Sequence, residues 1–198
     1  MSGIVRATAG SDTAPAMRVR PAFLPPRETV SVMDAIYGRR AVRNFAGDIV
    51  PEAALYALLY AAVQAPSAMH EEPWAFALIQ DPALLQEISG ASGLCKGGSI
   101  FHNAGTLVII YGRRSSAAAS ADCWLAASNI LLAACGMGLA TCIIGQAVDV
   151  LNRDAWKDKL DIPPDMQAIA PIVLGVPAED CAPVSRHPPD ILSWIKGP

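Results

Sequence analysis

Residues 106–144 read TLVIIYGRRSSAAASADCWLAASNILLAACGMGLATCII, and this stretch decides the fold class. The uncharged run Thr106–Tyr111 is rich in β-branched residues, which predicts a buried strand. The alanine- and leucine-rich segment over about 117–135 predicts a long apolar helix that ends at the glycines just after it. Residues 140–144 predict a second, shorter buried strand. A long helix between two buried strands indicates a sheet with helices packed against it.

Further elements are predicted on both sides of this stretch. Ser31 and Asp34 form a capping-box pattern at the start of a short helix, and Asp81 followed by Pro82 is typical of another helix start. The alternation of helices with apolar strands indicates an α/β or α+β fold in a single domain over residues 29–198. We expect helices over 31–38, from 51 to about 62, 82–89 and 152–160, and strands over 74–80 and 167–175.

Residues 1–28 differ in composition from the rest of the chain. They carry Gly, Ser, Thr, Ala and Pro with no helical period, which is typical of an N-terminal arm and not of a domain. Such an arm is ordered only where something holds it, for example a partner subunit.

The segment from Cys123 to Gly145 carries no charge and has the length of a membrane span. Polar residues at Ser128, Asn129 and Thr141 interrupt it, and no cluster of Lys or Arg flanks it. A buried helix followed by a buried strand explains the segment better, so we expect no membrane partner.

The composition limits the classes of partner. The chain has 198 residues and a formal net charge of -3, which argues against a nucleic-acid surface. Charged residues make up only 17%, against about 25% in an average protein. Because a soluble chain with so little charge usually buries surface in an oligomer, we expect a large apolar subunit interface.

The cysteines and histidines show no metal-ligand spacing. The three histidines lie far apart in the sequence, so no metal site is expected. The number of cysteines is odd and no Cys-x-x-Cys pair occurs, which fits reduced thiols in a cytoplasmic protein. The cysteines are Cys95, Cys123, Cys135, Cys142 and Cys181.

A compact arginine cluster follows the first predicted helix. Arg39, Arg40 and Arg43 fall within five positions of a chain that has only 15 basic residues. The guanidinium group is a fixed cation whose donors suit phosphate. The cluster therefore indicates either a site for one small anionic ligand or a solvated arginine turn.

Two other segments contain candidate site residues. The loop over 65–74 is stiffened by two prolines and carries Ser67 and His70, although an ordinary helix-to-strand connection has the same pattern. The glycine pair Gly136 and Gly138 ends a helix instead of opening one, which excludes a dinucleotide fingerprint. Cys142 lies in an apolar strand and is interpreted as a small buried hydrophobic residue.

Four segments in order resemble the FMN-dependent nitroreductase family. They are Arg39-Arg40-Ala41-Val42-Arg43-Asn44-Phe45, Ala65-Pro66-Ser67-Ala68-Met69-His70-Glu71-Glu72-Pro73-Trp74, the stretch Asn129–Gly145, and Leu174-Gly175-Val176-Pro177. The resemblance covers the chain from about Val30 to Arg186. It implies an α+β fold with a central, mostly antiparallel sheet flanked by helices, in an intertwined homodimer with FMN sites at the interface.

The resemblance also implies which residues bind FMN and what the protein does. Arg39 would pair with the phosphate, and Arg43 would lie near the pyrimidine edge of the flavin. NADH or NADPH would reduce the flavin, which would pass the hydride to a small molecule such as a nitroaromatic or quinone. The implied FMN-binding residues are Arg39, Arg40, Ala41 and Arg43, then Pro66, Ser67, Ala68 and His70 from the other subunit, then Ile143, Ile144, Gly145 and Arg186.

The chain departs from the family pattern at three positions. Ala41 replaces the motif serine, while His70 and Glu72 replace an asparagine and a glutamine of the loop. These departures leave open two alternatives to an ordinary reductase. One is a specialised member that fragments flavin or dehalogenates a substrate, and the other is a non-catalytic flavin- or ligand-binding protein.

Overall fold

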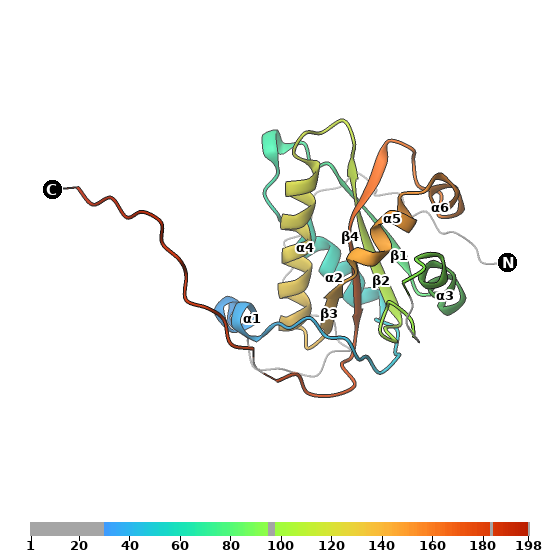
Figure 1. Ribbon diagram of the computed structural model, residues 1–198, viewed down its shortest axis with the longest axis horizontal. Helices are drawn as coiled ribbons and strands as arrows, with labels where there is room; N and C mark the ends of the chain where they lie inside the picture. Colours follow the sequence, from blue (N-terminus) through green and yellow to red (C-terminus); the bar gives the residue numbers. More distant parts are fainter. Residues whose placement is uncertain (1–29, 95–97, 183, 198) are drawn as a thin grey trace.

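The fold is built on a four-stranded antiparallel sheet with helices on both faces (Figure 1). The structure is a computed structural model and describes residues 30–94, 98–182 and 184–197. The expected arm over residues 1–28 therefore lies outside the described residues. The strand order is β1-β2-β4-β3, and all three neighbouring pairs are antiparallel, as predicted. The strands are β1 (Trp74–Ile79), β2 (Thr106–Arg113), β3 (Ala140–Ile143) and β4 (Met166–Gly175).

The helices lie close to their predicted positions, and their starts follow from local chemistry. Ser31 and Asp34 form the predicted capping box, in which the Ser31 hydroxyl accepts from the Asp34 N–H at 3.1 Å. The Asp81 carboxylate accepts from the Ala83 N–H at 2.9 Å, again as predicted. The helices are α1 (Val32–Gly38), α2 (Glu52–Ala62), α3 (Pro82–Ala91), α4 (Ala119–Gly136), α5 (Val148–Leu151) and α6 (Asp154–Lys159), with the 3-10 helices η1 (Ala68–His70) and η2 (Gly145–Ala147).

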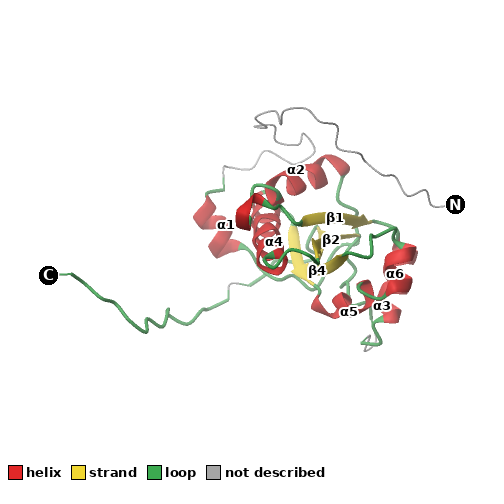
Figure 2. Ribbon diagram, turned by 90° about the horizontal axis from the view of Figure 1, so that it is seen from above, coloured by secondary structure: helices red, strands yellow, loops and turns green. Residues whose placement is uncertain are grey.

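The sheet separates two apolar cores, because successive residues of a strand point to opposite faces. In β2, Val108 and Ile110 face α2 and α4. Leu107 and Ile109 face the layer that contains α3, α5 and α6. Figure 2 shows the two helical layers on either side of the sheet. Burial on both faces explains why the central strands read as continuous apolar runs.

Helix α4 is the predicted long apolar helix and is central to the fold. Within the described residues it is the helix long and apolar enough to cross a membrane. In the structure it packs against α2, β2 and β4, and Ala126 and Ile130 are fully buried on that side. Its opposite side exposes Trp124 and Leu125, which are 41% and 45% accessible. The helix therefore belongs to the core layer while leaving an apolar stripe uncovered.

The helix predicted over 152–160 corresponds to α6, which begins two residues later, at Asp154. The short helix α5 just before it was not predicted, and Asn152 and Arg153 form the break between the two helices. The Asn152 side chain donates to the Ala168 carbonyl at 3.0 Å and accepts from the Ala168 N–H at 2.9 Å. Because this amide pairs with the backbone of β4, the chain turns there, and Arg153 adopts an extended conformation before α6 begins.

Candidate functional site

Residues 39–45, called the arginine segment below, form an extended strip along the free edge of β3. The Val42 N–H donates to the Thr141 carbonyl at 3.0 Å, and Ala41 and Thr141 form a parallel bridge. Val42 and Phe45 are buried, with 7% and 1% accessibility. Because side chains alternate in an extended chain, Ala41 and Arg43 point outward while Val42 points inward.

A pocket of about 170 Å³ opens beside this strip. It lies where the arginine segment, the C-terminal half of α4 and strand β3 meet. This volume is below the roughly 300–1,000 Å³ that is typical of a small-molecule site. The lining residues are Arg39, Ala41, Arg43, Leu131, Thr141, Cys142 and Ile143.

Two arginines of the pocket are available to bind an anion. Arg39 is half-buried and Arg43 is exposed. Within the parts of the chain that the structure describes, neither guanidinium group pairs with a carboxylate. Two uncompensated guanidinium groups on one pocket wall favour an anionic ligand over the alternative of a simple solvated turn.

Arg40 points elsewhere and stabilises the end of α1. Its guanidinium group donates to the Tyr37 carbonyl at 2.6 Å and to the Arg39 carbonyl at 2.9 Å. It also donates to the Ala182 carbonyl at 3.4 Å, which ties α1 to the C-terminal segment. A cation at the C-terminal end of a helix satisfies its last carbonyl groups.

The predicted residues after α4 occupy different environments. Ile143 lines the pocket and is 39% accessible. Ile144 is buried, and its N–H donates to the Pro171 carbonyl at 2.8 Å. Gly145 opens η2. The Ile144 N–H is thus already used within the chain, so among these three residues only Ile143 reaches the pocket wall.

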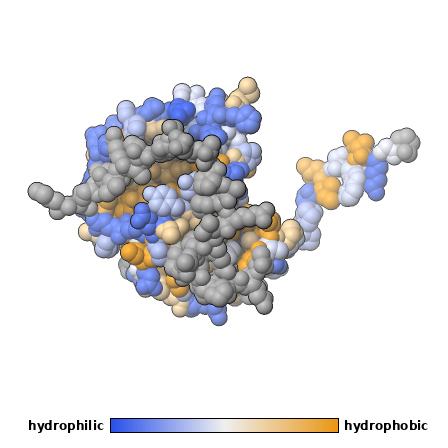
Figure 3. Space-filling model, turned by 180° about the vertical axis from the view of Figure 1, so that it is seen from behind, coloured by the Kyte–Doolittle hydropathy of each residue, from blue (hydrophilic) through white to orange (hydrophobic). Residues whose placement is uncertain are grey.

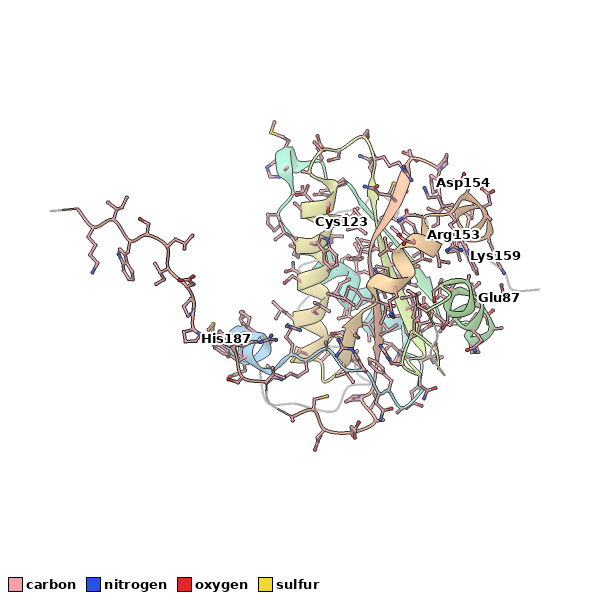
Figure 4. The ribbon with its side chains drawn as sticks, in the orientation of Figure 1. Glu87, Cys123, Arg153, Asp154, Lys159 and His187 are labelled. Atoms are coloured by element: carbon pink, nitrogen blue, oxygen red, sulfur yellow. The ribbon has the colours of Figure 1, made fainter. Side chains whose placement is uncertain are left out.

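The loop with Pro66, Ser67, Ala68 and His70 lies at the opposite end of α4 (Figure 4). The Ala68 N–H donates to a carboxylate oxygen of Asp122, in the first turn of α4, at 3.1 Å. The pocket residue Leu131 is nine positions further along the helix, which is roughly 14 Å at about 1.5 Å per residue. One chain therefore does not bring the loop and the pocket together.

Arg186 belongs to an extended C-terminal segment that starts beside the arginine segment. The Ala178 N–H donates to the Asn44 carbonyl at 3.0 Å, and the Asn44 side chain donates to Glu179 at 3.2 Å. Further along, the chain leaves the body of the protein (Figure 1). Arg186 is exposed and does not line the pocket described above.

Three pocket residues were not predicted as site residues: Leu131, Thr141 and Cys142. The interpretation of Cys142 as buried is confirmed, since it is 3% accessible. Burial raises the pKa of its thiol, while the nearby Arg43 acts in the opposite direction. All three residues lie in the stretch 106–144 that decides the fold, and this shared position is the sequence feature that could have indicated them.

His102 is a further neighbour of the pocket that sequence reasoning missed. Its carbonyl accepts from the Phe45 N–H at 3.2 Å, which holds its loop against the arginine segment. Burial lowers the pKa of His102, and the positive charge of Arg43 lowers it further. The imidazole is thus favoured in its neutral form beside the pocket.

The fold agrees with comparisons to known proteins. The model of the Nitroreductase family matches residues 36–94 and 93–176, which is most of the chain. The chain belongs to the nitroreductase family. This membership confirms the resemblance that the four sequence segments indicated.

Similar proteins include members with known structures. A nitroreductase with bound FMN from Bacteroides fragilis is 26% identical, with a TM-score of 0.73 over 84% of this chain and 98% of that chain. A protein of Archaeoglobus fulgidus, provisionally named NADH dehydrogenase/NAD(P)H nitroreductase, is 27% identical over 150 residues, or 73% of this chain and 84% of its own length. An iodotyrosine deiodinase from Haliscomenobacter hydrossis is 31% identical over 87 residues, or 38% of this chain and 39% of its own length. An FMN-dependent oxidoreductase is therefore the broad class that these relatives support.

Proposed function

We propose that this nitroreductase-family protein transfers hydride from NADH or NADPH, through FMN, to a small acceptor such as a nitroaromatic or quinone. The observation that carries the proposal is the pocket with two arginines, Arg39 and Arg43, that pair with no carboxylate among the described residues, in a chain of this family. The FMN-bound relative from Bacteroides fragilis supports the choice of cofactor.

The residues of the pocket fit the two chemically different ends of FMN. Arg39, half-buried at the end of α1, would hold the phosphate. Arg43 would stabilise negative charge on the pyrimidine edge of the reduced ring. Bound FMN supplies the hydride chemistry, while this chain binds the cofactor, orients it and tunes its charge. No acidic or basic side chain is required for hydride transfer, so we assign no catalytic residue.

We further propose that the site is completed in a homodimer. The pocket is small for FMN, and the loop with Ser67 and His70 lies at the far end of α4, so a second subunit is the natural source of that loop. The Ser67 hydroxyl accepts from the Glu72 N–H but keeps its own proton to donate.

Exposed apolar side chains support the same assembly. Large hydrophobic side chains remain exposed on α1, α2 and α4, among them Ile36, Tyr56 and Trp124. The C-terminal segment adds Leu192 and Ile195, which are 93% and 94% accessible. Figure 3 shows apolar side chains of this segment standing away from the body. A second copy of the chain would cover both surfaces.

Cofactor binding is tested by titrating the purified, FMN-depleted protein with FMN. We expect a yellow complex at one FMN per chain, and rapid anaerobic bleaching of the flavin by NADH or NADPH. A protein that takes up no FMN would contradict the proposal. A protein that binds FMN but is not bleached by either nicotinamide would instead be a non-catalytic flavin-binding protein.

Reductive dehalogenation is the second candidate function. The similarity to an iodotyrosine deiodinase over 87 residues favours it, and so do His70 and Glu72 in the loop. The test is the product of anaerobic incubation of the reduced holoenzyme with a halogenated phenol. Release of halide at a rate similar to nitroaromatic reduction would support dehalogenation, while quinone or nitroaromatic turnover without halide release would exclude it.

The compartment and domain organisation complete the proposal. Cys123, Cys135, Cys142 and Cys181 are free thiols among the described residues, which supports a reducing compartment such as the cytoplasm. We propose that residues 29–198 act as one FMN-binding domain without metal, nucleic acid or membrane partners.

A further inference from the structure

The loop between α2 and β1 has an unusual backbone. Met69, His70 and Glu72 have φ values of 53°, 56° and 42°, in the left-handed region that favours glycine. Non-glycine residues keep such conformations only where surrounding interactions hold them. Met69 is 89% accessible, so packing of its side chain does not supply that restraint.

Most hydrogen bonds of the loop are internal. The His70 N–H donates to the Ser67 carbonyl at 3.3 Å, and the Glu72 N–H donates to the Ser67 hydroxyl at 3.2 Å. These bonds shape the loop but do not fix its position on the protein. At the exit of the loop, the Arg113 N–H donates to the Pro73 carbonyl at 2.9 Å and fixes the start of β1.

One bond joins the centre of the loop to the core. The Ala68 N–H donates to the Asp122 carboxylate at 3.1 Å. Asp122 is 4% accessible and lies in the first turn of α4, where the helix dipole favours a negative charge. A bond from a backbone N–H to a carboxylate is stronger than one between neutral groups. The neighbouring Cys123 thiol senses the same charge, since burial and then Asp122 raise its pKa to about 12.

We propose that Asp122 is a positioning residue that holds the strained loop on α4 and thereby sets where Ser67 and His70 are presented. The buried carboxylate fixes Ala68, and the internal bonds of the loop transmit that position to the residues on either side. That these residues meet the flavin of the second subunit rests on the proposed function, whereas the anchoring of the loop does not.

The anchoring is tested by nuclear magnetic resonance of the Ala68 amide. Labelling with ¹⁵N-alanine and carbonyl-¹³C-serine selects the Ser-Ala pairs, which in this chain are 67–68, 116–117 and 120–121. We expect Asp122→Ala to shift the Ala68 resonance upfield and to speed its hydrogen exchange at least tenfold. Asp122→Asn keeps an acceptor oxygen without the charge, so its effect is expected to lie between those of the wild type and Asp122→Ala.

Asp154→Asn is the matched control. Asp154 also lies in the first turn of a helix, α6, but it is exposed and far from the loop (Figure 4). The control should leave the Ala68 resonance and its exchange unchanged. An Ala68 amide that is unaffected in both Asp122 variants, while their circular dichroism is native, would overturn the proposal.

The effect on the reaction is measured separately in the holoenzymes. We expect Asp122→Ala to raise the KM for the acceptor several-fold, with a smaller change in the rate of flavin reduction. The KM of Asp122→Asn should lie between those of Asp122→Ala and the wild type. Unchanged KM and kcat in a variant with a released loop would overturn the positioning role. If the wild type binds no FMN, the proposed function fails, while the Ala68 amide still decides whether Asp122 anchors the loop.

Discussion

The two ends of α4 carry two parts of the proposed site that are built in opposite ways. At the C-terminal end, the arginine segment is held by a backbone hydrogen bond to β3, by another to His102, and by the burial of Val42 and Phe45. At the N-terminal end, the backbone of the loop is strained, and within the described part of the chain its centre is held by one side chain, Asp122. The difference shows that the pocket wall is fixed by the core, while the loop is attached to the protein more lightly.

The largest effect is expected where the arginine segment enters the core. Phe45→Ala removes an aromatic ring that is 1% accessible and belongs to the apolar core, so the free energy of unfolding should fall by about 3–5 kcal/mol. Met69→Ala, at the exposed loop, should change it by less than about 0.5 kcal/mol. Chemical denaturation of both variants measures the contrast. Similar losses of unfolding free energy in the two variants would show that the loop contributes as much to stability as the strip along β3.

Arg39→Ala tests whether the pocket at the C-terminal end of α4 binds the FMN phosphate. The loss of a charge-assisted pair with phosphate should weaken FMN affinity by roughly tenfold or more, since such bonds contribute about 1.5–3 kcal/mol. Arg153→Ala, which removes an exposed arginine on the other face of the sheet, is the control. Fluorescence titration with FMN gives both affinities, and equal affinities for Arg39→Ala and the wild type would place the phosphate elsewhere.

The pH dependence of stability tests the surroundings of Arg43. The pKa of His102 lies below its ordinary value of 6.5 because of burial and the charge of Arg43. As the pH falls below 6.5, the unfolded chain therefore takes up a proton more readily than the folded one, and stability declines. His102→Gln should remove this decline, so the variant should gain stability relative to the wild type as the pH drops from 7 toward the lowered pKa. Parallel pH profiles would contradict the lowered pKa of His102.

The smallest effect is expected from relieving the strain of the loop. At a φ of 53°, Met69→Gly should be more stable than Met69→Val by about 1 kcal/mol, because a β-branched residue fits the left-handed region poorly. Thermal unfolding of the two variants provides the comparison. A valine variant that matches the glycine variant would mean that the loop adopts another backbone in solution.

The sequence predicted the elements whose pattern is local. β-branched runs and capping residues located the strands and most helices, since burial on both faces of the sheet leaves a continuous apolar run such as that of β2. The break at Asn152 could not be predicted, because it depends on pairing with Ala168 in a strand that follows later in the chain. The strain of the loop backbone could not be predicted from the sequence either, because the positions with positive φ, Met69 and His70, are not glycines.

Only part of the candidate site could be predicted, because some of its features depend on neighbours that are distant in the sequence. Arg39, Ala41, Arg43 and Ile143 line one pocket, and their role in binding FMN stays a prediction. The side chain of Arg40 binds backbone carbonyls, and Ile144 uses its N–H within the fold, which only three-dimensional neighbours reveal. Leu131 enters the site because one turn of α4 happens to face β3, and that rotation is set by packing and not by residue type.

The length of α4 has a consequence for how this protein can change over evolutionary time. Nine positions of this eighteen-residue helix separate Asp122 from the pocket residue Leu131 and fix the distance between the loop and the pocket. Each inserted or deleted residue would lengthen or shorten the helix by about 1.5 Å and rotate one end against the other by about 100°. We therefore expect that substitutions in this helix preserve the spacing between the loop and the pocket, whereas insertions and deletions disrupt it.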